Sequence, residues 1–448
     1  MSIKIEMPPV VSSIIRTLEG AGYEAYAVGG CIRDSIMGKE PSDWDICTSA
    51  LPEDTLRVLG RHNIVENGMK HGTVTVRIED CNYEITTFRT DGEYLDNRHP
   101  SEVTFVRDLR EDLSRRDLTV NSLAYNDSRG IIDLFGGISD IEHHRICCVG
   151  DPDKRFNEDA LRILRALRFS SQLGFEIEKN TSESILRNAG LLVNISAERI
   201  MSEFMKILTG SHCEKLLMEY RDVFAVFIPE IRPMFDFRQR NPHHSYDVWE
   251  HTVKVTSFAE PDPILKLASF FHDIGKPRTF TIDERNVGHF HGHPEVSAML
   301  AREILRRLKS DNHTINTVCL LIKLHDQRPP ANAKSVRQLV AKTGTECFPM
   351  LMSLKRADAK GQNPLMLGEK LRYIDELEGI FYAELANNAV FSLKQMALNG
   401  YDLQQIGIRE GKRIGIILNE LLALVIEGEL PNDHDRLLIE AFKLNERF

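Results

Sequence analysis

Two aspartates one residue apart, Asp43 and Asp45, lie near the start of the chain in the segment SDWDICT. On an extended segment, residues two apart point to the same side, so both carboxylates would face one way and Trp44 the other. Two converging carboxylates make a hard oxygen site for a divalent cation. Mg²⁺ suits such a site because it keeps water and substrate phosphates in its shell. The pair predicts metal-assisted chemistry on a phosphate compound.

A glycine turn precedes this pair in the segment YAVGGCIRDS, where Gly29 and Gly30 would join a strand to a short helix. Glycines let backbone amides approach a phosphate, and the N-terminus of a following helix favours negative charge. Arg33 adds a guanidinium able to pair with phosphate. Glu84, on a following strand, is a candidate third carboxylate, although acids are common on strand surfaces. A lone glycine pair is usually a tight turn and a lone DxD a solvated strand end, so the prediction depends on their combination.

GGCIRD followed by DWD resembles the signature of the DNA polymerase β nucleotidyltransferase superfamily, and within it the tRNA nucleotidyltransferases and bacterial poly(A) polymerases. The segment SRRDLTVN at 114–121 resembles the RRDxTxN element of this family. The resemblance implies that Arg116 contacts the triphosphate of the incoming nucleotide. Asp117 and Asn121 would hold the loop or sense the ribose, and a structural capping role for either residue is the alternative.

The segment EDALR at 158–162 resembles the EDxxR motif of the class II members. Asp159 and Arg162 are three residues apart, so on one helix they would share a face and offer an acceptor and donors to a base edge. The resemblance implies that they act as an amino-acid template for CTP and ATP. Leu161, Leu164 and Leu167 would pack inward, and Arg165 and Arg168 would meet phosphates or RNA from the polar side. The alternative is an amphipathic helix with a solvated charged face.

The polar segment 89–100 resembles the class II flexible loop, which the family associates with the switch from C to A addition. Its presence favours complete CCA addition. It is equally consistent with an ordinary exposed connection, and it does not exclude an enzyme that adds only the terminal A.

Nine of the sixteen histidines lie between 243 and 325. An ordered H…HD…H…H…D set within and after this stretch resembles the HD phosphohydrolase superfamily, which implies one or two metals that activate water against phosphoesters. Imidazole and carboxylate suit Mg, Mn, Ni or another divalent metal. A scaffold that only supports tRNA is the alternative. The expected ligands are His251, His272, Asp273, His293, His325 and Asp358. The nearby His243, His244, His289 and His291 are expected to include residues that contact these ligands or lie at the surface.

These residues require elements that position them. From about 23 to 140, short apolar runs broken by Gly and Asp predict mixed helix and strand, and after about 150 apolar residues recur at helical spacing. We expect a multidomain α+β protein with a polymerase-β-like nucleotidyltransferase head, whose mixed sheet carries helices, followed by an all-α body. The expected divisions are the head at 1–140, a helical neck and RNA-binding body at 141–240, a helical HD domain at 241–360 and a helical tail at 361–448.

Composition excludes several classes of protein. The 448 residues include 56 Lys and Arg against 66 Asp and Glu, and the formal charge of -10 excludes a surface that is basic throughout while leaving room for a local basic groove. The eight cysteines contain no CxxC pair, which argues against zinc fingers and disulfide scaffolds. Because the N-terminal segment shows no charged leader followed by a long apolar run, we expect a cytoplasmic protein without a membrane partner.

Taken together, the sequence resembles class II CCA tRNA nucleotidyltransferases that carry an HD domain. The resemblance implies template-independent addition of CCA to the 3′ end of tRNA from CTP and ATP, with release of pyrophosphate, Mg²⁺ in the head, and binding of the acceptor and TΨC arms. The motifs leave open an A-adding or CC-adding enzyme, a bacterial poly(A) polymerase, and an HD nucleotidase or phosphodiesterase with an inactive RNA-binding head. They also leave the oligomeric state open.

Overall fold

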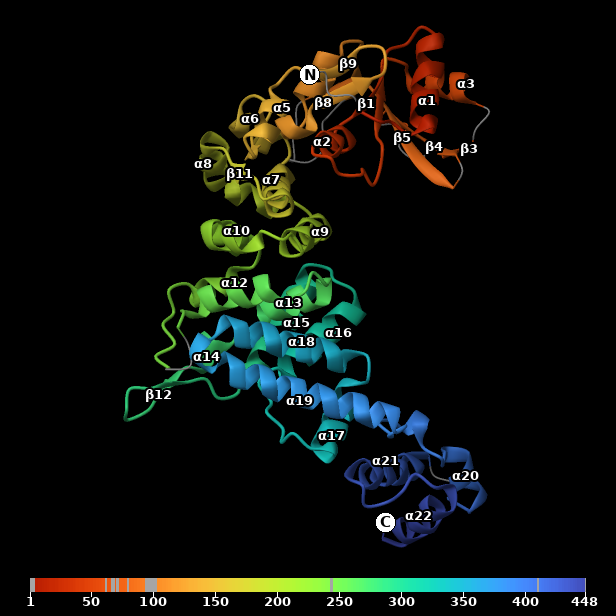
Figure 1. Ribbon diagram of the computed structural model, residues 1–448, viewed down its shortest axis with the longest axis vertical. Coiled ribbons are helices and arrows are strands. Elements are labelled where there is room, and N and C mark those ends of the chain that lie inside the picture. Colours follow the sequence, from red (N-terminus) through yellow and green to blue (C-terminus); the bar gives the residue numbers. More distant parts are fainter. Residues whose placement is uncertain are drawn as a thin grey trace. The chain divides into compact units, whose positions relative to one another are not determined.

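The computed structural model describes residues 5–447 apart from 61–62, 66–68, 70–71, 79, 93–102, 242–244 and 409–410. The chain divides into two compact units, Met1–Pro229 and Glu230–Phe448 (Figure 1). The finer division at 140, 240 and 360 stays a prediction. Among the described residues, no helix combines the length and the apolar character needed to cross a membrane.

The first unit is built on a seven-stranded sheet in the order β3-β4-β5-β2-β1-β8-β9. The pair β2 and β5 is parallel, and the other neighbours are antiparallel, so the sheet is mixed as predicted. The strands are β1 (Ala25–Val28), β2 (Ile46–Thr48), β3 (Asn63–Val65), β4 (Thr73–Ile78), β5 (Cys81–Thr87), β8 (Leu123–Asn126) and β9 (Gly130–Asp133).

Helices and short strands complete the head. Helix α1 is amphipathic and buries Val11, Ile14 and Leu18. A separate pair of strands, β6 and β7, flanks residues 93–102, so most of the segment expected to be the flexible loop lies outside the described residues. The elements are α1 (Pro9–Gly20), α2 (Gly30–Ile36), α3 (Pro52–Leu59), α4 (Leu109–Ser114), α5 (Gly137–Glu142), β6 (Arg89–Asp91), β7 (Val103–Phe105) and β10 (Arg145–Ile146).

The rest of the first unit is helical except for β11 (Glu176–Ile177), which pairs with β10. The sequence predicted one helix through the EDALR motif, but the chain breaks at Asp159, whose φ of -137° and ψ of 105° are extended. At the break the short carboxylate of Asp159 accepts the backbone N–H of Leu161 at 3.0 Å, a local bond that competes with helical hydrogen bonding. The helices are α6 (Pro152–Glu158), α7 (Leu161–Leu173), α8 (Lys179–Asn188), α9 (Ala197–Leu208), α10 (Cys213–Glu219) and α11 (Arg221–Phe227).

The second unit is helical apart from one short pair of strands, β12 (Thr281–Ile282) and β13 (Gly288–His289). A capping box of Asp247 and Glu250 starts α12. The last three helices share a separate core that includes Leu403, Ile417 and Leu437. The helices are α12 (Val248–Phe258), α13 (Pro263–Phe271), α14 (Lys276–Thr279), α15 (His293–Arg307), α16 (Asn312–Leu324), α17 (Ala333–Thr343), α18 (Cys347–Gly361), α19 (Leu367–Ala386), α20 (Gly400–Gln405), α21 (Gly411–Glu427) and α22 (His434–Arg447).

Candidate functional site

The two aspartates of the DWD motif lie directly before β2, which begins at Ile46, rather than within the strand as predicted. The segment nevertheless stays in register with the sheet, because the N–H of Val28 donates to the carbonyl of Asp45 at 2.9 Å. Trp44 is buried, whereas Asp43 and Asp45 are exposed. The two carboxylates therefore share one side of the chain, as the spacing predicted.

Glu84 comes to the same place from the neighbouring strand. Ile46 of β2 pairs in parallel with Ile85 of β5, so Asp45 and Glu84 each stand one position earlier and lie side by side. The pKa of Asp45 is raised from 3.8 to about 6, first because protein around the partly exposed carboxylate displaces water, and then because of the charges of Asp43 and Glu84. These crowded negative charges fit a divalent cation, which would relieve their repulsion.

The glycine turn faces an arginine across the site. Gly29 has a φ of 88°, a conformation that favours glycine, and a Cβ there would lie 3.3 Å from Nη1 of Arg116. Arg116 is oriented by the fully buried Asp112, whose Oδ2 lies 3.4 Å from Nη2. The buried Nε of Arg116 has no hydrogen-bond partner among the described residues. Sequence reasoning missed Asp112, although it stands four residues before Arg116.

Arg33 and Asn121 are joined to each other. Arg33 donates from Nη1 to Oδ1 of Asn121 at 2.6 Å, and from Nε and Nη2 to the carboxylate of Asp34 at 2.9 Å. Most of the Arg33 donors are therefore engaged within the protein. Among the roles left open for Asn121, this contact supports holding the loop.

Asp117 ties the RRD segment to α7. Its Oδ2 accepts from Nε of Arg165 at 2.6 Å, and its Oδ1 accepts from the backbone of Leu118 at 2.9 Å. Burial acts to raise the pKa of Asp117, but the charge and hydrogen bond of Arg165 outweigh burial and hold it at about 2. These bonds also favour a holding role for Asp117.

Because of the break at Asp159, Asp159 and Arg162 do not share a face of one continuous helix. Arg162 is buried and donates to Oε2 of Glu158 at 2.6 Å. Arg168 also differs from the sequence expectation, because its guanidinium is buried against Glu203 at 3.0 Å instead of lying on a polar face. Continued α-helical rotation from Arg165 carries Arg168 toward α9. We identified no local sequence signal that predicts the partner Glu203.

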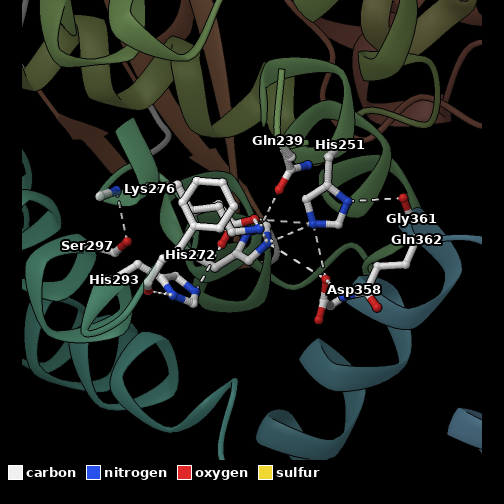
Figure 2. Close-up of polar contacts among 12 residues, drawn as sticks. Gln239, His251, His272, Lys276, His293, Ser297, Asp358, Gly361 and Gln362 are labelled. Atoms are coloured by element: carbon white, nitrogen blue, oxygen red, sulfur yellow. Dashed lines mark hydrogen bonds and ion pairs between the residues drawn. The ribbon is translucent and has the colours of Figure 1, made fainter. Parts of the chain in front are cut away.

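In the second unit the predicted histidines and aspartates gather from five separate helices or their ends. Figure 2 shows His251, His272, His293 and Asp358 directed toward one centre. All four predicted histidines of this set are buried, as is Asp273. The residues come from α12 (His251), the end of α13 (His272 and Asp273), the start of α15 (His293), the end of α16 (His325) and α18 (Asp358).

The four imidazoles share one tautomer. In each ring Nδ1 lies within 3.0 Å of a backbone carbonyl, that of Gly361, Ser269, Phe290 or Ile322. A carbonyl only accepts, so Nδ1 carries the proton and Nε2 of a neutral ring presents a lone pair. Metal-binding histidines are commonly held in this way.

The lone pairs face one another in two groups around Asp273. Nε2 of His251 and Nε2 of His272 are 3.3 Å apart, and Nε2 of His293 and Nε2 of His325 are 3.4 Å apart. Oδ2 of Asp273 lies 3.3 and 3.1 Å from the first pair, and Oδ1 lies 3.3 and 3.9 Å from the second. These two groups have the spacing of metal ligands.

The carboxylates of Asp273 and Asp358 favour positive charge in this cluster, whether that charge is a proton on His251 or a metal cation that replaces the proton. Burial acts to lower the pKa of His251, but the hydrogen bonds and the charges of Asp273 and Asp358 together outweigh burial and raise the pKa to about 9. Sequence reasoning did not assign Lys276, which donates to Gln239 at 2.9 Å and lies 2.7 Å from Oδ2 of Asp273. The sequence HDIGK at 272–276 contained a signal for this contact, because Lys276 follows Asp273 by three residues.

Of the remaining predicted histidines, His289 and His291 do not join the cluster. His289 pairs with the exposed Asp283 at 2.9 Å, and its ring stacks on that of His291. His243 and His244 lie outside the described residues. A hollow of about 290 Å³ adjoins the cluster and is lined by Lys276, His291 and Arg328 as well as metal-ligand candidates.

Three family models match the chain. Residues 25–147 match the poly(A) polymerase head domain, residues 174–235 match the RNA- and SrmB-binding site of polymerase A, and residues 293–441 match tRNA nucleotidyltransferase domain 2. The third match begins at His293 and overlaps the expected HD segment, and the HD assignment stays a prediction.

Comparison with whole proteins identifies the same family. The chain is 35% identical over 440 residues to the CCA-adding enzyme of Lacticaseibacillus paracasei, across 97% of this chain and 96% of that relative. It is 52% identical over 197 residues to the CCA-adding enzyme of Geobacillus kaustophilus, across 44% of this chain and 48% of that relative. The crystal structure of the Bacillus stearothermophilus CCA-adding enzyme in complex with CTP matches with a TM-score of 0.74 and 28% identity, across 99% of both chains. The chain therefore belongs to the family of CCA-adding enzymes.

Proposed function

We propose that this chain adds C, C and A in turn to the 3′ end of tRNA, using CTP and ATP and releasing pyrophosphate in the cytoplasm. The observation that carries the proposal is the meeting of Asp43, Asp45 and Glu84 beside the turn at Gly29, in a chain that aligns over almost its whole length with a CCA-adding enzyme. The relative solved with CTP supports the nucleotide class.

The three carboxylates would hold Mg²⁺. When bound, such an ion acidifies the 3′-hydroxyl of the tRNA and neutralises charge on the triphosphate. Glu84 and Asp43 keep negative charge around Asp45, and the carboxylate of Asp45 must be ionised to bind the cation. Arg116, whose Nη1 would lie 3.3 Å from a Cβ at Gly29, is the proposed cationic contact for a phosphate at this turn.

Asp159 and Arg162 are the proposed readers of the base. A carboxylate accepts and a guanidinium donates, so together they complement the mixed acceptor and donor edges of cytosine and adenine. Both residues already have protein partners that orient them, Arg199 for Asp159 and Glu158 for Arg162. Base choice without a nucleic-acid template is the function that this arrangement supports.

The test uses purified protein, Mg²⁺ and three tRNA transcripts that end before CCA, after C and after CC, with CTP, ATP or both. We expect stepwise completion to CCA and then arrest. Addition of A alone or C alone would select an A-adding or CC-adding enzyme, and an unlimited A tail would select a poly(A) polymerase. A D43A variant that still transfers at the wild-type rate would contradict the metal role of the head carboxylates.

A second candidate function, metal-dependent hydrolysis of phosphoesters, is favoured by the cluster in the second unit. The specific observation is that four Nε2 lone pairs converge around Asp273 with each Nδ1 bonded to a carbonyl, an arrangement that a cation would stabilise. The two groups would hold one or two divalent ions, and the imidazole-rich set suits Mn or Ni as well as Mg. A bound ion would supply an activated water, and Lys276 and Arg328 line the adjoining hollow as cationic contacts for a phosphate.

This second proposal is tested by two measurements on the whole chain. Metal content after dialysis against Mn²⁺ or Ni²⁺ should approach one or two ions per chain and fall in H272A and H325A variants. The loaded protein should hydrolyse bis(p-nitrophenyl) phosphate, whereas these variants should not. Loading without hydrolysis would leave a structural metal centre, and an absence of loading would support the scaffold alternative.

A further inference from the structure

A buried carboxylate stands behind the proposed phosphate contact of the head. Asp112 of α4 is fully buried, and its Oδ2 lies 3.4 Å from Nη2 of Arg116. Nη1 of Arg116, the other end of the same guanidinium, would lie 3.3 Å from a Cβ at Gly29. Because a guanidinium is planar and rigid, an acceptor at one end restricts how the other end can turn. Asp112 therefore orients the donor that faces the glycine turn.

The other oxygen of Asp112 is bonded to a second arginine and to a strand. Oδ1 accepts from Nη2 of Arg115 at 2.7 Å and from Nε of Arg115 at 3.2 Å. The backbone N–H of Arg89 donates to the same oxygen at 3.3 Å. Nε of Arg115 also donates to the carbonyl of Arg89 at 3.0 Å. Both backbone polar groups of Arg89 are thus bonded to the pair formed by Asp112 and Arg115.

Arg89 connects this pair to the central sheet of the head. The residue before it, Phe88, is fully buried and donates from its backbone N–H to the carbonyl of Thr48 in β2 at 2.7 Å. This bond continues the pairing of β2 with β5, the two strands that position the head carboxylates. The side chain of Arg116 is therefore tied, through Asp112 and Arg89, to the strands that set the place of the metal site.

The charges in this group keep Asp112 ionised. Burial acts to raise the pKa of Asp112, but the charges of Arg116 and Arg115, with the hydrogen bonds from Arg115 and Arg89, outweigh burial and lower it. The ionised carboxylate offsets two positive charges that would otherwise repel each other. An asparagine would have nearly the same shape, but it would lack the charge and would turn an N–H donor toward a guanidinium.

We propose that Asp112 is a positioning residue that fixes Arg116 where it meets the triphosphate of the incoming nucleotide, in register with the head carboxylates. The inference rests on the phosphate contact proposed for Arg116. CTP and ATP carry the same triphosphate, so the loss of Asp112 should weaken both alike and leave the choice of base unchanged. Pyrophosphate carries phosphates of the same kind, so its binding should weaken as well, whereas a ligand without phosphate should bind as before.

The test compares D112N, D112E and R116Q in the full chain with Mg²⁺ and tRNA. For D112N we expect the KM for CTP, the KM for ATP and the inhibition constant of pyrophosphate each to rise about tenfold, because a charge-assisted hydrogen bond no longer orients the guanidinium. The inhibition constant of cytidine and the preference for CTP over UTP should not change. D112E restores the charge and should lie between D112N and the wild type. D133N is the matched control and should leave all these constants unchanged, because Asp133 also accepts from backbone N–H groups of the head, those of Gly137 and Ile138 at 2.9 Å.

Each outcome bears on one level of the inference. If D112N keeps the wild-type inhibition by pyrophosphate while R116Q loses it, the phosphate contact of Arg116 stands and Asp112 has no positioning role. If R116Q also keeps it, the phosphate contact is wrong and the inference fails with it. Equal weakening of cytidine and pyrophosphate in D112N would show a general structural role and overturn the inference. The double variant D112N/R116Q should bind pyrophosphate no more weakly than R116Q, because Asp112 acts through Arg116.

A separate variant keeps the inference testable if D112N does not fold. R115Q leaves the carboxylate of Asp112 in place and removes the two bonds that Arg115 donates to it, together with the bond to the carbonyl of Arg89. We expect R115Q to raise the inhibition constant of pyrophosphate without changing that of cytidine. An unchanged inhibition constant of pyrophosphate in R115Q would then overturn the inference.

Discussion

At the scale of single residues, the raised pKa of Asp45 shows that its ionised carboxylate destabilises the folded protein, while the same negative charge can bind a divalent cation. A folded-state pKa of about 6 against an ordinary value of 3.8 means that the folded chain resists ionisation of this carboxyl group. The folded state therefore loses stability as pH rises from about 4 to above 6, and the loss is complete at neutral pH. The negative charge that causes this loss is the charge that a divalent cation would use.

Replacing Asp45 by Asn should therefore stabilise the metal-free protein. At pH 8 without divalent ions, we expect D45N to raise the free energy of unfolding by up to about 1 kcal/mol, a value discounted for the exposure of the side chain. The gain should vanish toward pH 4, where the wild-type carboxyl is protonated. Urea unfolding at both pH values measures this difference. Mg²⁺ should reverse the order at pH 8 by stabilising the wild type alone, and a gain independent of pH would contradict the electrostatic cause.

At the scale of elements, local spacing predicted the head motifs but not the partners that hold them. Trp44 faces inward and Asp43 outward because alternation along an extended segment depends on neighbouring residues alone. The burial of Arg168 depends on a bond to Glu203, which lies 35 residues away, and the carboxylate of Asp159 is paired with Arg199, which lies 40 residues away. One sequence without an alignment shows no signal for such a pair.

The pair of Arg168 and Glu203 should contribute more to stability than pairs on the surface. Both side chains are buried, so E203A would leave a buried guanidinium without its carboxylate and should lower the free energy of unfolding by about 3 kcal/mol. The exposed pair of Lys215 and Glu176 is the matched control, and for E176A we expect no measurable change in the free energy of unfolding. Chemical denaturation measures both variants. Equal losses would show that burial does not strengthen the first pair.

At the scale of the whole molecule, the head carboxylates and the histidine cluster lie in different compact units. Binding to the folded state stabilises the segments that form the site, so each ligand should protect its own unit. We expect chelation of protein loaded with Mn²⁺ to speed amide exchange in α12, α13, α16 and α18, and Mg²⁺ with CTP to slow it in β1, α2 and β5. Hydrogen-exchange mass spectrometry resolves these segments. Chelation that leaves exchange in the four helices unchanged would argue against a metal bound by the histidine cluster.

The net charge of the molecule constrains how it binds its proposed substrate. With a formal charge of -10, the protein as a whole repels RNA, so tRNA must meet a local set of basic residues. Each phosphate that such a set neutralises releases counterions, and the logarithm of the association constant should therefore fall linearly with the logarithm of salt concentration, by close to one unit for each contact. Filter binding of tRNA between low and high salt measures this slope, with an uncharged nucleoside as the control ligand. An association constant that does not change with salt would mean that the protein binds tRNA without contacting the phosphates of the RNA. The proposed binding of the acceptor and TΨC arms through phosphates would then be wrong.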